Sequence, residues 1–405
     1  MRARSALRHR FAASGVALVL LTAAACSSGS SDAGTDSGAS GPATTLPAAE
    51  AAKAYTEPGP YPVGITTLTL AGDRKVEVWY PAAKGTTGTD TYDVRALIPE
   101  TVRNLLTANI PATFTIDAGR DAEVADGRFP LVLFSHGFSG FRQQSSFLTS
   151  HLASWGFVVA APDHWQRDLF HVLDRVLGTS GPEATDPVAD LRDTRELMAS
   201  QDAAEGSRFA GHVSTDRVVA VGHSAGGGTI LGVAGDEGVV GYVSMASGLL
   251  RSMASTTTTS VAPPELPDTP SLFLAGAADA VVPVADATQP AYAAAAAPTR
   301  LWVIDKVGHN GFDDLCTLGG GKGIIGIAEA SGLGAFLDGQ QSFRRLGQDG
   351  CLPPAVPVRQ TFPIIEHSVT AFVRNAFGID AEPVGLGPDV AGQYSVPVTI
   401  RERLS

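Results

Sequence analysis

The chain contains little cysteine and little positive charge. Three cysteines, Cys26, Cys316 and Cys351, occur among 405 residues, and no further ligands are spaced around them for a metal ion. Lysine and arginine together number 29 against 41 aspartates and glutamates, which gives a formal net charge of -12. A chain of this sign repels the phosphate backbone of nucleic acids. We therefore expect neither a metal site nor a nucleic-acid partner.

The apolar segment near the N-terminus is too short to span a bilayer. It follows a basic stretch, MRARSALRHR, and this order predicts a signal peptide over residues 1–25. The small residues before Cys26 resemble the bacterial lipobox, which implies that Cys26 is lipidated and holds the protein on a membrane surface. A plain secretory signal cleaved nearby is the alternative. Both predict an extracytoplasmic protein, either anchored to the bacterial cell membrane by lipid or secreted.

The segment that follows Cys26 has too little apolar surface to form a core. Residues 26–57 are mainly Ser, Gly, Ala, Thr and Pro, so we expect a disordered linker there. In an oxidising compartment the two remaining cysteines, Cys316 and Cys351, most simply form a disulfide.

Residues 58–378 carry the alternation of strands and helices. Two alternating runs at 64–70 and 75–80 predict an antiparallel hairpin. Continuous apolar runs predict buried strands at 130–136, 156–164, 217–224, 241–247, 271–276 and 300–305. Helical patterns occur at 146–155, 186–202 and 367–377. This order predicts an α/β fold with a mostly parallel, doubly wound sheet and helices on both faces.

Two segments fall outside this alternation. Residues 82–126 interrupt it and predict one or two short helices, which suits either a lid or an idle surface insertion. Residues 379–405 are expected to form a C-terminal tail.

The stretch AVGHSAGGGT, residues 220–229, contains the pattern G-x-S-x-G around Ser224. It follows a buried strand and precedes a run of small residues that can begin a helix. Strand, sharp turn and helix are the context of a nucleophile elbow, in which Gly222 and Gly226 allow close packing around a strained serine. A glycine-rich turn with a structural serine is the alternative.

A serine hydroxyl needs a base and a carboxylate that orients the base. Asp279 follows the predicted strand 271–276, and His309 follows the predicted strand 300–305. The chain order Ser224, Asp279, His309 is the order expected after such an elbow. Because ligands bind beyond the carboxyl ends of strands in open α/β sheets, we expect these three side chains to meet there.

The remaining histidines and acids fit these roles less well. His223 lies inside the motif and should point away from the hydroxyl, and His164 precedes the nucleophile in the chain. Asp305 and Asp163 are alternatives to Asp279, but each is expected to end a strand. Structural roles are expected for three further histidines: His136, His151 and His367.

An ester-cleaving serine also needs backbone N–H donors for the oxyanion. Ala225 follows the serine and is one candidate, and Phe138 in the loop FSHGFSG is the second. We also expect the Phe138 ring to line the substrate pocket. Phe141 and Trp165 are further candidates for that pocket, although an aromatic residue is more often part of the core.

Five stretches together resemble one branch of the α/β-hydrolases. They are YPVGITTLTL, VEVWYPA, FPLVLFSHGFSGFRQQSSFLTSHLASWGFVVAAPDH, VGHSAGG and GHNGFDDLC, and they resemble the platelet-activating factor acetylhydrolase-like and dienelactone-hydrolase-related branch over most of residues 58–378. The acid loop GAADAVVP is similar to that of bacterial cutinases and polyester hydrolases. The resemblance implies an α/β-hydrolase fold of about eight strands, no cofactor, and ester hydrolysis through an acyl-enzyme.

The chain also departs from these relatives. Dienelactone hydrolases use a cysteine where this chain has Ser224, and the acetylhydrolases place their acid on the strand directly after the elbow. The segment between Cys316 and Cys351 is absent from the cutinase pattern. The sequence therefore predicts a serine carboxylic-ester hydrolase whose substrate is a small-molecule, lipid or polymeric ester, and it assigns no oligomeric state.

Three alternatives stay open. Within catalysis they are a lipase or phospholipid acetylhydrolase and a cutinase-like polyester hydrolase. Outside catalysis, a surface lipoprotein could use the hydrolase fold only to bind a ligand.

Overall fold

A computed structural model describes residues 48–106, 110–178, 183–249 and 266–405. The predicted signal peptide, Cys26 and most of the predicted linker lie outside these residues. No helix in the described ranges is long and apolar enough to cross a membrane.

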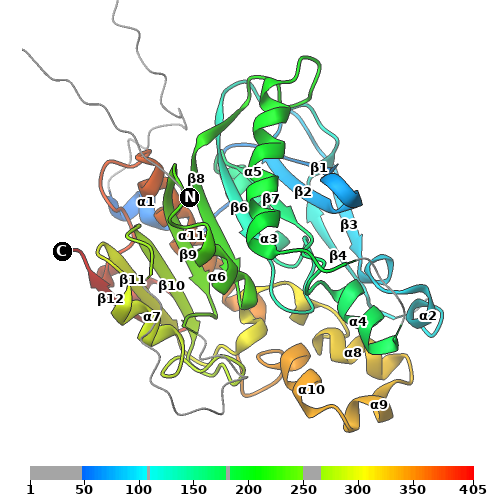
Figure 1. Cartoon of the computed structure of the whole chain (residues 1–405). Helices are drawn as coiled ribbons and strands as arrows, with labels where there is room; N and C mark the ends of the chain where they lie inside the picture. The colour runs from blue at the N-terminus through cyan, green and yellow to red at the C-terminus, as the bar shows by residue number, and fades with distance from the viewer. Residues whose placement is uncertain (1–47, 107–109, 179–182, 250–265) are drawn as a thin grey trace, which may run out of the picture. The chain divides into compact units, whose positions relative to one another are not determined.

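One large mixed sheet organises the described chain (Figure 1). Its strand order is β12-β11-β10-β9-β8-β6-β7-β2-β1-β5. The ten strands are β1 (Val63–Thr69), β2 (Lys75–Pro81), β5 (Gly119–Arg120), β6 (Phe129–Ser135), β7 (Val158–Pro162), β8 (Val213–His223), β9 (Val239–Met245), β10 (Ser271–Gly276), β11 (Thr299–Ile304) and β12 (Val398–Arg403). About eight strands were predicted, and the two additional ones, β5 and β12, lie at opposite edges of the sheet.

The centre of the sheet is parallel and its flanks are antiparallel. Strands β7, β6, β8, β9, β10 and β11 run parallel to one another. The predicted hairpin is confirmed, because β1 pairs antiparallel with β2 from Val63 opposite Pro81 to Thr69 opposite Lys75. The mostly parallel, doubly wound sheet predicted from the sequence is therefore present.

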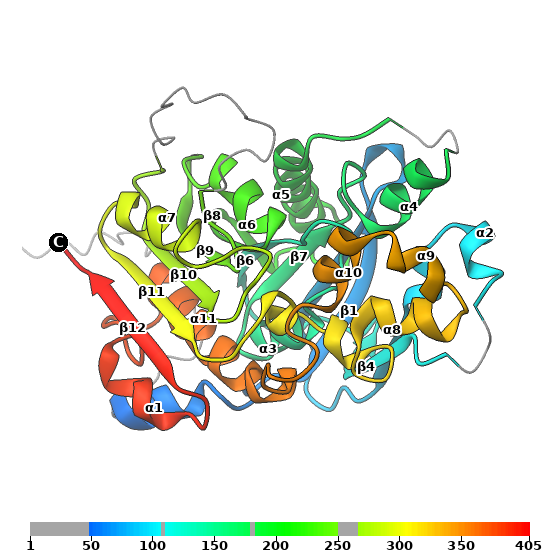
Figure 2. The same cartoon turned by 90° about the horizontal axis from the view of Figure 1, so that it is seen from below.

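Helices cover both faces of the sheet (Figure 2). Helices α5, α6 and α7 lie on one face, and α1, α3 and α11 lie on the other. The helices are α1 (Ala48–Ala54), α2 (Glu100–Arg103), α3 (Ser146–Ser154), α4 (Leu169–Leu177), α5 (Pro187–Ala203), α6 (Ala225–Thr229), α7 (Thr288–Ala294), α8 (Gly323–Ala330), α9 (Gly334–Asp338), α10 (Gln341–Gln348) and α11 (Phe362–Phe377).

Local sequence signals define the ends of the longer helices. Asp186 caps α5 by accepting the Val188 N–H at 3.0 Å, and Pro187 starts that helix with its φ already suitable. Helix α11 ends at Phe377 and is capped by Gly378, whose φ of 74° is in the left-handed region. The helical pattern at 367–377 predicted the last 11 of the 16 residues of α11, which begins at Phe362.

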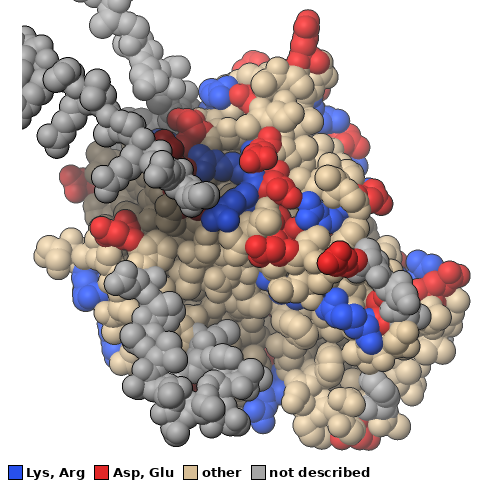
Figure 3. Space-filling model, in the orientation of Figure 1, with Lys and Arg blue, Asp and Glu red and all other residues tan. Residues whose placement is uncertain are grey.

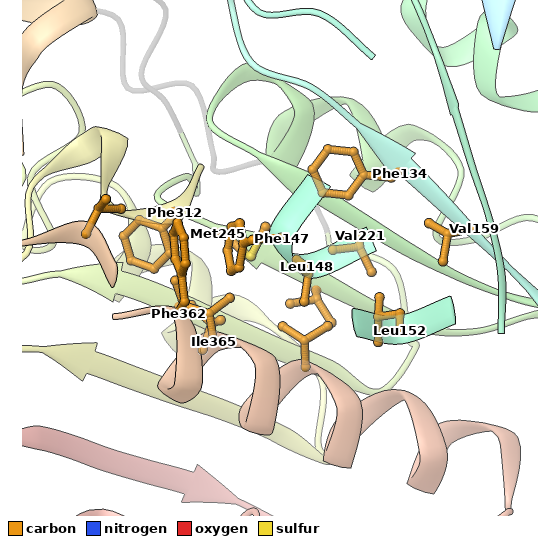
Figure 4. Packing of buried hydrophobic residues seen from close by; sticks show 14 of the residues in the cluster. Phe134, Phe147, Leu148, Leu152, Val159, Val221, Met245, Phe312, Phe362 and Ile365 are labelled. Atoms are coloured by element: carbon orange, nitrogen blue, oxygen red, sulfur yellow. The ribbon is translucent and has the colours of Figure 1, made fainter. Parts of the chain in front are cut away.

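Two apolar cores lie between the sheet and the helices, one on each face of the sheet. One contains Leu191 and Met198 of α5, and the other contains the side chains of α3 and α11. In the second core the rings of Phe147 and Phe362 stack with centroids 3.9 Å apart, between α3 and α11 (Figure 4). A rigid, close-packed sheet of this kind fixes where the loops at its edge can lie.

Both ends of the described chain differ from the prediction. The linker predicted for residues 26–57 ends earlier, because α1 packs on the fold with Ala52 and Tyr55 buried. Tyr55 donates a hydrogen bond to Asp380, which pairs with Arg374. The predicted tail, residues 379–405, contributes β12 to the sheet. Extended residues beside the exposed edge of β11 satisfy its backbone groups, which a free tail would leave open.

Two excursions leave the sheet and meet at one end of it. Residues 82–126 include a two-stranded sheet, formed by β3 (Thr89–Asp93) and β4 (Thr113–Asp117), with α2 between the two strands. Residues 315–351 form α8, α9 and α10, and a Cys316–Cys351 disulfide closes this second excursion, as predicted. Helices α2, α4, α8, α9 and α10 gather at the same end in both views (Figures 1 and 2).

Candidate active site

Ser224 lies on a strained turn between β8 and α6. Its φ of 55° and ψ of −123° are unusual for a residue with a side chain. A Cβ on Gly226 would lie 1.9 Å from the Ser135 carbonyl oxygen, and one on Gly222 would lie 2.4 Å from the Gly226 backbone. Only glycine therefore fits at these two positions. The backbone around Ser224 has the geometry that the G-x-S-x-G pattern predicts.

The Ser224 hydroxyl, His309 and Asp279 form a hydrogen-bonded series. The hydroxyl donates to His309 Nε2 at 2.8 Å, and His309 Nδ1 donates to Asp279 Oδ2 at 2.9 Å. The other carboxylate oxygen of Asp279 accepts the N–H groups of Val281 and Val282 at 2.8 and 2.7 Å. The three side chains come from loops after β8, β10 and β11, so the parallel centre of the sheet brings them together.

Two residues next to Ser224 carry the backbone N–H groups that the sequence predicts for an oxyanion. Ala225 begins α6, and the first N–H groups of a helix have no partner within it. Gly137 packs against Ser224, because a Cβ on this glycine would lie 3.2 Å from the Ser224 Cβ. This close approach places Phe138, the next residue, beside the serine. Within the described chain neither Phe138 nor Ala225 uses its N–H in a hydrogen bond.

Gln144 joins the three loops around the serine, a role that the sequence did not indicate. Its side-chain oxygen accepts the Gly137 N–H at 3.0 Å, and its amide nitrogen donates to His223 Nδ1 at 2.6 Å. His223 Nε2 in turn donates to the His309 carbonyl at 3.1 Å. Burial, followed by the nearby His309 ring, holds the pKa of His223 well below its usual value. A neutral His223 can accept one hydrogen bond and donate the other, as this chain of contacts requires.

Asp349 is a second residue that the sequence did not indicate. One of its carboxylate oxygens accepts the His309 N–H at 2.7 Å and the Ala280 N–H at 3.3 Å. Its backbone carbonyl accepts the Asn310 N–H at 2.9 Å. Asp349 therefore links the loop of Asp279 to the loop of His309. It lies two residues before Cys351, at the point where the second excursion returns to the sheet.

A second Ser–His–Asp arrangement lies below the elbow. Ser135 contacts His164 Nε2 at 2.9 Å, and His164 Nδ1 lies 2.9 Å from Asp190. All three side chains are fully buried, and Arg167 also donates to the Ser135 hydroxyl at 2.8 Å. Burial holds the pKa of His164 well below its usual value. No ester can reach Ser135, so this arrangement supports the loop beneath the elbow.

A cavity of about 350 Å³ opens directly over Ser224. Ser224 and His309 lie on its wall together with Gly137 and Phe138. The remaining wall comes mostly from α4 and from the two excursions. Access to this cavity distinguishes Ser224 from Ser135.

Comparison with known proteins places the chain in a family. A family model described as PET hydrolase-like matches residues 122–355, more than half of the chain. The chain belongs to the PET hydrolase-like family. A model described as platelet-activating factor acetylhydrolase, isoform II, matches residues 57–171. The polyester-hydrolase and acetylhydrolase resemblances seen in the sequence correspond to these two matches.

Solved structures share the fold of this PET hydrolase-like chain. A ferulic acid esterase from Streptomyces cinnamoneus is 20% identical with a TM-score of 0.54, and the match covers 85% of this chain and 98% of that one. No curated protein sequence matches the chain significantly. The α/β-hydrolase fold is thus established. Because 328 solved chains match, the fold alone does not specify a substrate.

The predicted pocket aromatics of the PET hydrolase-like chain divide into two groups. Phe138 lines the cavity and its side chain is 44% exposed. Phe141 is buried in the core, where its ring lies 6.5 Å from that of Phe114, and Trp165 packs beside His171 at 5.0 Å. Neither lines the cavity. Their prediction as pocket residues is wrong, because the rings pack against Phe114 of β4 and His171 of α4 instead of lining the cavity.

The remaining histidines take the structural roles expected of them. His136 accepts the His164 N–H at 3.1 Å, His151 donates to the Tyr55 carbonyl at 3.0 Å, and His367 lies 2.7 Å from the Tyr394 hydroxyl. Burial lowers the pKa of His151 and that of His367 to about 4. In the described ranges no group of three or more His, Cys, Asp or Glu residues is arranged to hold a metal ion.

Proposed function

We propose that the protein is a serine carboxylic-ester hydrolase with Ser224 as nucleophile, His309 as general base and Asp279 as the acid that orients the base. The observation that carries the proposal is the hydrogen-bonded series from Ser224 to His309 to Asp279, at 2.8 and 2.9 Å, on the wall of an accessible cavity. The PET hydrolase-like family and the ferulic acid esterase fold support ester substrates.

The first half of the reaction forms an acyl-enzyme. The Ser224 oxygen attacks the ester carbonyl carbon while His309 Nε2 takes the hydroxyl proton. The carbonyl oxygen becomes an oxyanion, which the free N–H groups of Phe138 and Ala225 stabilise. The carbon–oxygen bond to the alcohol then breaks, and His309 gives its proton to the departing alkoxide.

The second half releases the acid. Water loses a proton to His309 Nε2 and attacks the acyl carbon, and the second oxyanion collapses with return of the proton to the Ser224 oxygen. Asp279 keeps the Nδ1 proton in place and stabilises the imidazolium that forms in both halves. Apart from the ester, the protein and one water molecule supply every reacting group in these steps.

The proposal extends to where the reaction occurs. The basic and apolar N-terminal segment and the small residues before Cys26 support export, followed by lipid anchoring or by release. Incubation of expressing cells with labelled palmitate tests the anchored form, because only a lipidated Cys26 incorporates the label and Cys26→Ala abolishes it. Protein that is found in the medium and carries no label would support release instead of anchoring.

A fluorophosphonate probe combined with ester hydrolysis tests the catalytic assignment. We expect the wild type to hydrolyse p-nitrophenyl esters and to be labelled at Ser224. Ser224→Ala should lose both, with a rate reduction on the order of 10⁴-fold or more. Ser135→Ala is the matched control, because its hydroxyl is buried, and labelling at Ser224 should persist. An unlabelled wild type that still binds esters would favour the ligand-binding alternative.

A further inference from the structure

The cavity over Ser224 is lined mainly by aliphatic side chains. Most of its polar side chains belong to the loops around Ser224, apart from Arg95 and Gln340. Within the described chain, Phe138 and Phe343 carry the only phenyl rings on its wall. The aliphatic wall consists of Val94, Ile98, Val102, Leu106, Ala112, Leu169, Val172, Leu173, Val176, Leu315, Ile324, Ile325, Ile327, Ala328, Leu333, Leu337 and Leu346. Such a wall offers no hydrogen bonds to a polar substrate and few ring faces to an aromatic one.

Helices from three separate parts of the chain build this wall. They are α2 from the first excursion, α4 after β7, and α8, α9 and α10 from the second excursion. These helices gather at one end of the sheet (Figures 1 and 2). The sheet and the elbow supply Ser224, and the excursions supply the surroundings that a substrate chain would contact.

The volume of the cavity limits the length of such a chain. A closed apolar cavity of about 150 Å³ holds benzene, with six carbons. The cavity here is about 350 Å³, so it has room for roughly a dozen carbons. Some of that volume lies at the mouth, which makes a chain of about eight to twelve carbons the best fit.

Exposed apolar side chains gather around the same elements. Seven large hydrophobic side chains are exposed in the described ranges, and only Leu352 and Leu404 lie away from the cavity-forming segments. The other five are Leu105, Phe138, Phe170, Val176 and Leu177. In the space-filling view, which has the orientation of Figure 1, the surface over α8 and α10 consists mainly of uncharged residues (Figure 3). An apolar molecule reaching the mouth thus meets few charges.

We propose that the substrate is an ester carrying an unbranched aliphatic chain of medium length, and that this chain fills the cavity formed by the two excursions and α4. The inference rests on the proposed function and narrows it to one substrate class. It disfavours aromatic polyesters and feruloyl esters, whose rigid rings would leave much of an aliphatic cavity unfilled.

Two ester series test the inference, one with a variable acyl chain and one with a variable alcohol chain. The first uses p-nitrophenyl acetate, butyrate, octanoate, decanoate and palmitate, and the second uses alkyl acetates from ethyl to decyl. Each buried methylene should raise kcat/KM by roughly three- to fourfold until the cavity is full. A rise in the acyl series identifies the acyl chain as the occupant, and a rise in the alcohol series identifies the alcohol.

A pair of variants on α8 ties the chain-length preference to the cavity. Ala328 lines the cavity and is half-buried, so Ala328→Trp fills the space without replacing a packed side chain. Ala330 is exposed on the same helix and does not line the cavity. We expect Ala328→Trp to lower the ratio of kcat/KM for octanoate to kcat/KM for acetate at least tenfold. Ala330→Trp should leave this ratio and both rates unchanged.

The outcomes separate failure of the inference from failure of the proposed function. Hydrolysis that requires Ser224 overturns the inference alone if p-nitrophenyl acetate is fastest in the acyl series and ethyl acetate is fastest in the alcohol series. Hydrolysis that is faster on aromatic polyester film than on any soluble ester has the same consequence. A length preference that Ala328→Trp leaves unchanged also overturns it. If the folded wild type hydrolyses no ester in either series, the proposed function itself fails.

Discussion

At the scale of single residues, the elbow depends on glycines that differ sharply in their surroundings. Gly226 has the Ser135 carbonyl where a Cβ would lie, whereas Gly228, two residues later on α6, has nothing within 4 Å of that position. The same substitution should therefore have opposite effects at the two sites.

Gly226→Ala should destabilise the protein by several kcal/mol and abolish ester hydrolysis, because α6 must move away from β6. Gly228→Ala should be neutral or stabilise by up to ~1 kcal/mol, because alanine favours the helix. Thermal unfolding and kcat of both variants test this pair. A stable, fully active Gly226→Ala would contradict the packing described here.

Gln144 offers a second test at this scale. Gln144→Leu leaves the Gly137 N–H and His223 Nδ1 without their partner, so we expect a loss of roughly 1–3 kcal/mol in stability. Because Gln144 positions the Phe138 loop without reacting itself, kcat should fall at least tenfold while KM changes little. A normal kcat in a variant that is merely less stable would show that the contact is structural only.

At the scale of elements, the second excursion returns to the sheet at the proposed active site. Asp349 binds N–H groups of both the His309 loop and the Asp279 loop, and Cys351 fixes the same return to Cys316. The excursion thus both forms the cavity wall and holds the two loops of the proposed triad.

Asp349→Ala should lower kcat by about ten- to a hundredfold, because two backbone donors lose their acceptor and the His309 loop loses its link to Asp279. Asp349→Asn keeps an oxygen acceptor and should recover much of the rate. Asp338→Ala is the matched control, since its side chain lies on the same excursion and is 77% exposed. Equal rates for the Asp349 and Asp338 alanine variants would exclude a positioning role.

The disulfide closes a sequence separation of 35 residues. Replacing both cysteines by serine should cost about 3–4 kcal/mol, because the unfolded chain regains the freedom of that loop. Denaturant unfolding of the double variant measures this loss. No change in the midpoint would mean that the excursion does not unfold with the rest of the domain.

At the scale of the whole molecule, buried ionisable groups make stability depend on pH. Burial, followed by repulsion from Asp314, raises the pKa of Glu366 from 4.5 to about 8, and burial raises that of Asp314 to about 7. The folded state therefore holds protons that the unfolded state releases. The contribution of these groups is complete below the unfolded pKa and is lost as pH rises through the folded one.

Glu366→Gln should remove part of the stability loss that the wild type shows as pH rises. We expect the variant to match the wild type in acid and to be more stable by a few kcal/mol at alkaline pH, above about 8. Urea unfolding across this range measures the difference, and Glu382→Gln, at an exposed position, is the control. The buried histidines act in the opposite direction, with stability lost on acidification, and the difference between variant and wild type cancels their effect.

The order of elements and the chemistry of the site could be predicted because both follow local patterns. Buried parallel strands such as β8 and β10 are continuous apolar runs, and Ser224, Asp279 and His309 each follow one of them. The edge strands β5 and β12 carry no such signal. Strand β12 alternates exposed and partly buried residues and pairs only because β11 has an open edge.

The sequence by itself determined the alternation of strands and helices, the elbow and the three side chains proposed for catalysis, because each depends on residues adjacent in the chain. Tertiary structure alone decided which Ser–His–Asp arrangement a substrate can reach, which aromatics line the cavity, and how Gln144 and Asp349 join the loops. Those features depend on contacts between segments far apart in the sequence, where burial and distance replace local pattern as the deciding quantities.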